Sequence, residues 1–159
     1  MLAPDELRKA FKMVEEENWA FRAFLKATEP DDLDRVVNEW HKTLFAEMDC
    51  RSCQNCCKSM TPALTNKDVA RIAGVLGLTF DDFRTKYLKE DGGEWIVNGK
   101  SCPFLTNDGC SIYDYRPKAC REYPYTDKKE TSSRLMSLVA NCAVCPVVFE
   151  IFEKLKKRY

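Results

Sequence analysis

The chain of 159 residues is 45% hydrophobic and 31% charged, which suits one compact domain with a modest core. Lysine plus arginine and aspartate plus glutamate both number 25, so no net charge attracts nucleic acid or an anionic membrane. The N-terminus lacks the pattern of a signal peptide, and no stretch reaches the roughly 18 apolar residues of a membrane span. We therefore expect a cytoplasmic protein with no nucleic-acid or membrane partner.

Residues 1–48 predict two amphipathic helices. Apolar residues recur every three or four positions from 7 to 25, and Pro30 ends this pattern. Asp31 and Asp32 favour the start of a second helix, in which apolar residues recur from 33 to 48. We expect these helices to form an antiparallel hairpin, which also offers a docking surface for an unknown protein partner.

Two capping sequences predict a pair of helices in the middle of the chain. Residues 65–68 and 79–82 both begin with threonine and carry aspartate three positions later, the arrangement of a capping box. The first helix should end at Gly77 and the second before Gly92. Both are interpreted as scaffold.

From Glu94 onward the sequence favours strands and turns. Residues 95–97 followed by Asn98 and Gly99 predict a hairpin with a type I′ turn, and residues 107–109 mark a second turn. Residues 117–123 predict a single helical turn, and a last helix begins near Pro146. Residues 126–133 are polar and expected to be exposed, whereas residues 135–140 receive no assignment.

The predicted fold class is mainly α with a small β-hairpin, in a single compact metal-centred domain. Within it, residues 1–48 form the N-terminal helical hairpin packed on the rest. Residues 49–159 form a cysteine-cluster metal-binding domain, and the two parts are expected to be one folding unit.

Nine cysteines are the most unusual feature of the composition. A reducing cytosol keeps them as thiols, which leaves metal ligation, redox chemistry or burial as their roles. A disulfide scaffold requires oxidising conditions and leaves one cysteine of the nine unpaired. We take all nine as candidate metal ligands: Cys50, Cys53, Cys56, Cys57, Cys102, Cys110, Cys120, Cys142 and Cys145.

The first cysteines have the most specific spacing. Cys50, Cys53 and Cys56 repeat every third residue, as in the bacterial ferredoxin loops that hold three corners of a cubane. Cys57 points in a different direction from its neighbour Cys56. It is therefore expected to bind a second metal, or to lie next to the ligands of the first metal without binding it. We expect all of these residues to lie in loops or at the ends of elements.

The later cysteines offer further ligands. Cys142 and Cys145 form a CxxC pair whose spacing suits zinc and iron-sulfur sites alike. Cysteine precedes proline at Cys102 and again at Cys145, echoing the proline that follows the last ferredoxin cysteine. Eight thiolates would complete two four-ligand sites, and the ninth cysteine would be a spare, a bridging ligand or a buried residue.

The motifs together resemble a known family. The string CRSCQNCC at residues 50–57, followed by SCPFLTNDGCSIYDYRPKACREYP at 101–124 and the late CxxC, is similar to the CxxCxxCC cysteine-cluster family of zinc- or iron-chelating domains. Members are often labelled iron-sulfur proteins or oxidoreductases, and flagellin lysine methylases are similar in this region. The resemblance covers residues 49–146 and implies chelation of metal by about eight of the nine cysteines.

Two arginines and one histidine are further candidates for the metal site. Arg116 and Arg121 flank Cys120, where a guanidinium would stabilise a negatively charged cluster, although surface ion pairs are an equally good reading. His41 is the only histidine and lies off the apolar stripe, so we expect it to be exposed rather than a ligand. No motif for nucleotide binding or hydrolysis is present, which leaves enzymatic activity undecided.

The leading interpretation is a protein that holds an iron-sulfur cluster, of the 4Fe-4S type, for electron transfer or metal handling. Cys50, Cys53 and Cys56 would bind one cubane, and the later cysteines would supply its fourth ligand and a second site. The alternative is structural zinc in a protein-interaction module. A third reading makes the chain a component of a redox or methyl-transfer enzyme system.

Overall fold

The computed structural model describes residues 1–99 and 101–159. Within that part of the chain, helices dominate and the strands form two small antiparallel sheets, so the predicted fold class is confirmed. The chain divides into two compact units, which we call unit 1 (residues 1–55 and 124–159) and unit 2 (residues 56–123). The predicted domains 1–48 and 49–159 concern folding and stay a prediction.

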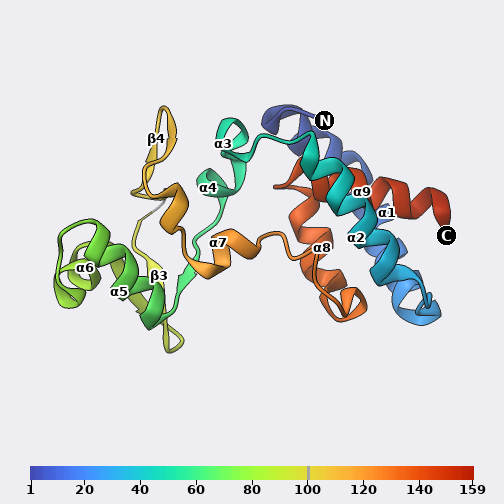
Figure 1. Cartoon of the computed structure of the whole chain (residues 1–159). Helices are drawn as coiled ribbons and strands as arrows, with labels where there is room; N and C mark the ends of the chain where they lie inside the picture. Colours follow the sequence, from blue (N-terminus) through green and yellow to red (C-terminus); the bar gives the residue numbers. More distant parts are fainter. Residues whose placement is uncertain (100) are drawn as a thin grey trace. The chain divides into compact units, whose positions relative to one another are not determined.

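Unit 1 is built from four longer helices that lie side by side (Figure 1, blue to cyan and orange to red). They are α1 (Pro4–Thr28), α2 (Leu33–Ala46), α8 (Leu135–Cys142) and α9 (Pro146–Arg158). The helix α9 contacts the other three, and α1 also packs on α8. The two predicted N-terminal helices are confirmed, but α1 packs mainly on α8 and α9, and α2 packs on α9, rather than mainly on each other.

The core of unit 1 follows from the apolar stripes of these helices. α9 buries seven residues, which is why it lies at the centre of the unit. α8 was missed by sequence analysis because it is short and apolar on much of its surface, so it has no clear helical period. The buried apolar residues of this core include Leu7, Leu25, Val37, Leu135, Val139, Val147, Val148, Ile151, Phe152 and Leu155.

The segment between Pro124 and α8 is anchored to α2 by polar contacts. Asp34 accepts hydrogen bonds of 2.7 Å from the backbone N–H groups of Glu130 and Thr131, at the start of the short 3₁₀ helix η2 (Thr131–Arg134). His41 contacts the Thr126 hydroxyl at 2.7 Å through Nδ1. Both threonines are 2% exposed, so the expectation that residues 126–133 are exposed is wrong for them. His41 is half-buried rather than exposed.

Unit 2 places two helices against a three-stranded sheet. The helices are α5 (Asn66–Val75) and α6 (Phe80–Tyr87), and the strands are β1 (Ala63–Leu64), β2 (Leu88–Asp91) and β3 (Glu94–Val97), in the order β1-β3-β2. Both predicted helices are confirmed, and Thr65 and Thr79 cap them through their side-chain oxygens. Their core comprises Leu64, Val69, Ile72, Ala73, Phe83, Leu88, Val97, Phe104 and Ile112.

The first hairpin does not lie where the sequence predicted it. β2 pairs with β3 through a turn at Gly92 and Gly93, whose φ angles of 58° and 84° are both positive, as a type I′ turn requires. Asn98 and Gly99, which were expected to form this turn, instead follow β3. The register is set by burial, because it pairs Leu88 with Val97 and buries both residues in the core.

The second predicted turn is confirmed. β4 (Leu105–Thr106) pairs with β5 (Gly109–Cys110) across a two-residue turn. Beyond it lie the 3₁₀ helix η1 (Tyr113–Tyr115) and the short helix α7 (Lys118–Glu122), which carries Cys120 as expected. This hairpin therefore delivers Cys110 at the end of a strand, with Cys102 just before it.

The segment with the first four cysteines is helical. α3 (Cys50–Cys53) and α4 (Asn55–Ser59) are single-turn helices separated by Gln54, which has a positive φ of 54°. Cys50 and Cys53 lie at the two ends of α3, as expected, whereas Cys56 and Cys57 lie within α4 rather than in a loop. The boundary between unit 1 and unit 2 falls just after this break, between Asn55 and Cys56 of α4.

No single helix of residues 1–99 and 101–159 is long and apolar enough to cross a membrane. Residues 131–142 and 146–158 reach the length and hydrophobicity of a membrane span only when both helices are taken together. The two helices are bent by 119° at the break between them.

Candidate metal centre

The nine thiols are distributed over both units. Unit 1 contains Cys50, Cys53, Cys142 and Cys145, whereas unit 2 contains Cys56, Cys57, Cys102, Cys110 and Cys120. The ferredoxin-like run of Cys50, Cys53 and Cys56 is therefore shared between the units. Its assignment to one cubane stays a prediction, as does the full ligand set.

The thiols of Cys50 and Cys53 are presented by α3. Asp49 caps this helix by accepting from the backbone N–H of Arg51 at 2.9 Å and from the hydroxyl of Ser52. With helical spacing of three residues, the two cysteine side chains lie on one face of the turn. α3 thus forms a short, capped platform for two neighbouring donors.

Cys145 lies near this platform and accepts backbone hydrogen bonds. Its side chain is only 7% exposed, and burial raises the pKa of the thiol to about 12, with smaller upward contributions from Cys50 and Cys53. Hydrogen bonds from the N–H groups of Val148 and Val147 act in the opposite direction on this pKa. Cys145 precedes α9, so its sulfur faces the amides of the first helical turn.

A buried amide joins the two cysteine segments of unit 1. Asn55, which is 4% exposed, donates a 2.6 Å hydrogen bond from Nδ2 to the carbonyl oxygen of Val144. Val144 lies directly before Cys145, and Asn55 lies two residues after Cys53. The contact holds the loop between Cys142 and Cys145 beside the segment that follows α3.

Cys142 differs from the other thiols of unit 1. It is 0% exposed, and its Sγ lies 3.2 Å from the carbonyl oxygen of Leu138 and 3.9 Å from that of Val148. A sulfur facing two carbonyl oxygens donates its hydrogen to them, because oxygen lone pairs repel a thiolate. Burial raises the pKa of this thiol further, so Cys142 is held in its protonated form.

In unit 2, Cys102 repeats the arrangement of Cys145. Its sulfur accepts hydrogen bonds from the backbone N–H groups of Phe104 and Leu105, although burial raises its pKa overall. Both cysteines precede proline, which has no N–H, so the sulfur accepts from the next two residues instead. Such N–H to sulfur bonds are characteristic of cysteine ligands in metal centres.

Cys102, Cys110, Cys120 and Cys57 influence one another electrostatically. Burial is the main cause that raises the pKa of Cys120 to about 12, followed by the charges of Cys57, Cys102 and Cys110. The pKa of Cys102 is likewise raised by Cys57 and Cys110, after burial. Unit 2 therefore brings together thiols that are up to 63 positions apart along the chain, from 57 to 120.

Adjacent Cys56 and Cys57 are in contact with each other. A hydrogen bond from Cys56 is the largest cause that lowers the pKa of Cys57, to about 6, and the positive charge of Arg116 contributes in the same direction. At neutral pH, the metal-free chain therefore carries Cys57 mainly as a thiolate. The surrounding residues thus prepare Cys57 for metal binding.

The two arginines predicted near the metal have different surroundings. Arg116 lies 3.5 Å from the centroid of the Tyr113 ring and donates from Nε to the Tyr113 carbonyl at 2.8 Å, so its charge is held near Cys57 and Cys120. Arg121 donates to the Arg116 carbonyl and lies 4.0 Å from the carboxylate of Asp68. Arg116 acts on the thiols, whereas Arg121 acts on the backbone that carries them.

Asp68 positions the helix that carries Cys120. This carboxylate is 3% exposed and accepts from Arg71 at 2.6 Å, from the backbone N–H of Lys118 at 3.1 Å and from Thr65. Lys118 is the first residue of α7. One buried carboxylate thus caps α5 and fixes the start of α7.

Sequence analysis missed the residues that support the thiols. Asn55 was given no role and Asp68 only that of a capping residue, because their partners Val144 and Lys118 are 89 and 50 residues away. The N–H groups that reach Cys102 and Cys145 could have been found from the two Cys-Pro sequences, since proline directs the sulfur to the following amides.

The donor chemistry fits a thiolate-bound metal. Most of the candidate sulfurs lie near other thiols, and two of them accept backbone N–H bonds. Among residues 1–99 and 101–159, however, no three cysteine, histidine or carboxylate side chains lie close enough together for a metal ion to bind them at once. A centre built from these thiols therefore requires the sulfur atoms to approach one another more closely.

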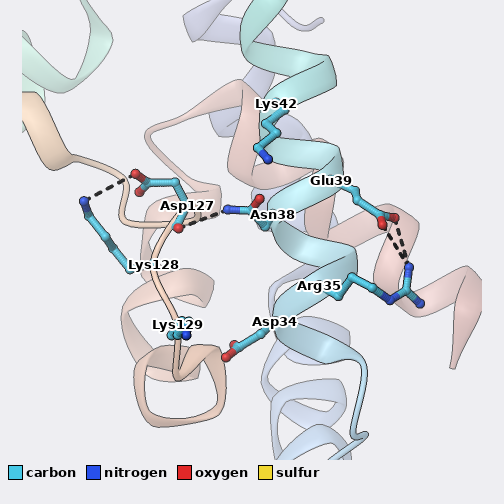
Figure 2. Close-up of a pocket in the computed structure, with 8 residues that line it drawn as sticks. All are labelled: Asp34, Arg35, Asn38, Glu39, Lys42, Asp127, Lys128 and Lys129. Atoms are coloured by element: carbon cyan, nitrogen blue, oxygen red, sulfur yellow. Dashed lines mark hydrogen bonds and ion pairs between the residues drawn. The ribbon is translucent and has the colours of Figure 1, made fainter.

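A separate cavity of about 410 Å³ lies on unit 1, away from the cysteines. Figure 2 shows Asp34 and Asn38 of α2 pointing toward residues 127–129, whereas Arg35 points away from them and pairs with Glu39. Asn38 bridges the two sides by donating to the Asp127 carbonyl at 3.0 Å. Both signs of charge line the cavity, so it has no single electrostatic preference.

Comparisons with known proteins bear on the cysteine-rich region. Residues 49–145 match the CxxCxxCC family, described as "Putative zinc- or iron-chelating domain". The uncharacterized protein MJ0661 of Methanocaldococcus jannaschii is 38% identical over 82 residues, which span 48% of this chain and 44% of that protein. The chain therefore matches less than half the length of this relative. No solved structure matches. Because the family match extends over more than half of the chain, the protein belongs to the CxxCxxCC family of cysteine-rich zinc- or iron-chelating domains.

Proposed function

We propose that the protein holds iron-sulfur clusters of the 4Fe-4S type through its cysteine thiolates and serves in electron transfer or metal handling. The observation that carries this proposal is the pairing of clustered thiols with N–H donors at Cys102 and Cys145. Membership of a chelating family supports the coarser statement that the cysteines bind zinc or iron.

The charge balance around the thiols favours a cluster. Several thiolates on one centre accumulate negative charge, which backbone N–H groups and a nearby cation offset. Arg116 supplies that cation in unit 2, because its charge reaches Cys57 and Cys120. A reduced cluster is one charge more negative than its oxidised form, so the same contacts favour uptake of an electron.

Structural zinc is the second candidate, and one observation favours it. Unit 1 contains two CxxC pairs, Cys50 with Cys53 and Cys142 with Cys145, which is the ligand spacing of many closed zinc sites. Against this reading, the Cys142 thiol donates to the Leu138 carbonyl, whereas a zinc ligand must be a thiolate.

Metal analysis of protein purified without oxygen tests the proposal. We expect iron and acid-labile sulfide in comparable amounts, with broad visible absorption that bleaches on reduction. Protein whose thiols are alkylated before reconstitution is the control and should take up neither. Stoichiometric zinc in a colourless protein that takes up no iron on reconstitution would rule out the cluster.

A further inference from the structure

We infer that the core of unit 1 binds an internal water molecule at the side chain of Asn18, and that this water bridges Asn18 to Arg22. Asn18 lies in α1 and is 0% exposed. Neither its Oδ1 nor its Nδ2 has a hydrogen-bond partner among the residues that the structure describes. The site involves none of the cysteines, so the inference goes beyond the proposed function and does not depend on it.

Asn18 interrupts an apolar stripe of α1. The residues of this stripe alternate at intervals of four and three, which is the spacing of a seam between packed helices. They are Leu7, Phe11, Val14, Asn18, Phe21 and Leu25. Leu7 and Leu25 are both 0% exposed, so the stripe faces the core. A buried amide without hydrogen bonds is strongly unfavourable, and native proteins satisfy such a group with a protein atom or with an ordered water.

Contacts on both sides of Asn18 hold α9 against this part of α1. Glu17, directly before Asn18, accepts a 2.8 Å hydrogen bond from Nζ of Lys156. The rings of Phe21 and Phe152 meet edge to face, with their centroids 5.6 Å apart. Rotation of α1 that brings Asn18 into solvent would break both contacts. The amide must therefore be satisfied inside the core.

Arg22 provides a second polar atom on the same face of α1. It lies four residues after Asn18, one helical turn further along. Its Nε is buried and has no hydrogen-bond partner among the described residues. A water between the two side chains would donate to Oδ1 of Asn18 and accept from Nε of Arg22.

The chemistry of the site suits water better than an ion. The amide of Asn18 is neutral and presents one acceptor and a donor group, and a water molecule can match both. Buried waters make about three hydrogen bonds, and they do so to polar groups that lack a protein partner. Asn18 and the Nε of Arg22 are two such groups, placed one turn apart.

NMR of the full ¹⁵N-labelled chain tests for this water. The side-chain NH₂ of Asn18 should show a nuclear Overhauser effect to water with the sign of a long-lived contact. Asn55 is the matched control, because it is 4% exposed but donates directly to the Val144 carbonyl, and it should show none. A high-resolution crystal structure should place one water about 3 Å from Oδ1 of Asn18.

Variants test the bridge between the two side chains. Asn18→Leu removes both polar atoms and should abolish the water contact at the Nε–H of Arg22. Arg22→Met keeps an unbranched side chain without the guanidinium, and it should weaken the water contact at Asn18. Arg8→Met is its control, because Arg8 is an exposed arginine of the same helix, and it should change nothing.

The outcomes separate this inference from the proposed function. An Asn18 amide without a water in the wild-type NMR spectra and crystal structure would overturn the inference. An unchanged water contact at Asn18 in folded Arg22→Met would overturn the bridge. If Asn18→Leu does not fold, the two wild-type measurements still decide whether the water is present. Wild-type protein that shows this water but takes up no metal would contradict the proposed function alone.

Discussion

Asn55 and Val144 are joined by a 2.6 Å hydrogen bond although 89 residues separate them in the chain. The donor is a buried side-chain amide, and the acceptor is the carbonyl next to Cys145. The contact fixes the distance between the two segments that carry the unit 1 thiols. It is therefore the clearest example of how non-ligand residues prepare the candidate metal centre.

Replacing Asn55 by alanine should lower the free energy of unfolding by about 2 kcal/mol, because the carbonyl of the half-buried Val144 loses the hydrogen bond from the buried Asn55 side chain. Asn38→Ala is the matched control, since Asn38 also donates to a backbone carbonyl, that of Asp127, but from a half-buried position. It should cost about 1 kcal/mol. Urea unfolding measures both, and equal losses would contradict a special role for Asn55.

The Asp68→Ala variant should lose about 3 kcal/mol of stability, because Arg71 and the Lys118 N–H lose a buried carboxylate partner. Burial acts to raise the pKa of Asp68, but hydrogen bonds from Thr65 and Arg71 outweigh it, so this pKa is lowered. The stabilisation is therefore present above the unfolded pKa, near 4, and is lost as the pH falls through the folded value.

Asp82→Ala provides the control for Asp68. Asp82 occupies the same capping position in α6 and contacts Thr79 at 2.6 Å, but it is exposed. Its replacement should cost about 1 kcal/mol. Urea unfolding of both variants at neutral pH and near pH 3 measures the difference. A loss in Asp68→Ala no larger than that in Asp82→Ala would refute the role of Asp68 in fixing α7.

Sequence patterns predicted the helices better than the turns and the site. Thr65 and Asp68 identify the start of α5 because capping is a local interaction. The hairpin turn was misplaced because Gly92 with Gly93 and Asn98 with Gly99 both suit a type I′ turn, and only core packing selects the first pair.

The division of the cysteines could not be predicted at all. Cys53 and Cys56 have ideal spacing for a shared cluster, yet they belong to different units. Local spacing does not report which distant segments a cysteine will meet. The buried state of Cys142 was also hidden, because it depends on α8, which the sequence analysis left unassigned.

Alkylation of metal-free protein should single out Cys57. With a pKa of about 6, its reaction with iodoacetamide should remain fast at pH 7 and slow as the pH falls through about 6, because only the thiolate reacts. Cys120, with a pKa raised to about 12, should react slowly throughout. Peptide mass spectrometry measures both rates.

Variants separate the causes of the low pKa of Cys57. Cys56→Ala should raise this pKa more than Arg116→Gln does, because the hydrogen bond from Cys56 is the larger cause. Arg116→Lys keeps the positive charge and should change the pKa least. A larger effect of Arg116→Gln than of Cys56→Ala would contradict this order.

Acidification should destabilise unit 1 through His41. Burial lowers the pKa of His41 below its usual value of 6.5, so the unfolded chain takes up a proton at higher pH than the folded one. The contribution of neutral His41 to stability is then complete above about pH 6.5, and it is lost as the pH falls through the pKa of His41 in the folded protein. His41→Gln should remove this part of the pH dependence in urea unfolding. An unchanged pH profile in that variant would exclude His41 as the cause.

The most direct test of the central claim is X-ray absorption at the iron and zinc edges of protein prepared without oxygen. The account predicts iron surrounded by sulfur, with a second iron beyond it, as in a cluster held by thiolates. Iron bound only by oxygen or nitrogen, or a sulfur-bound zinc without iron, would contradict it.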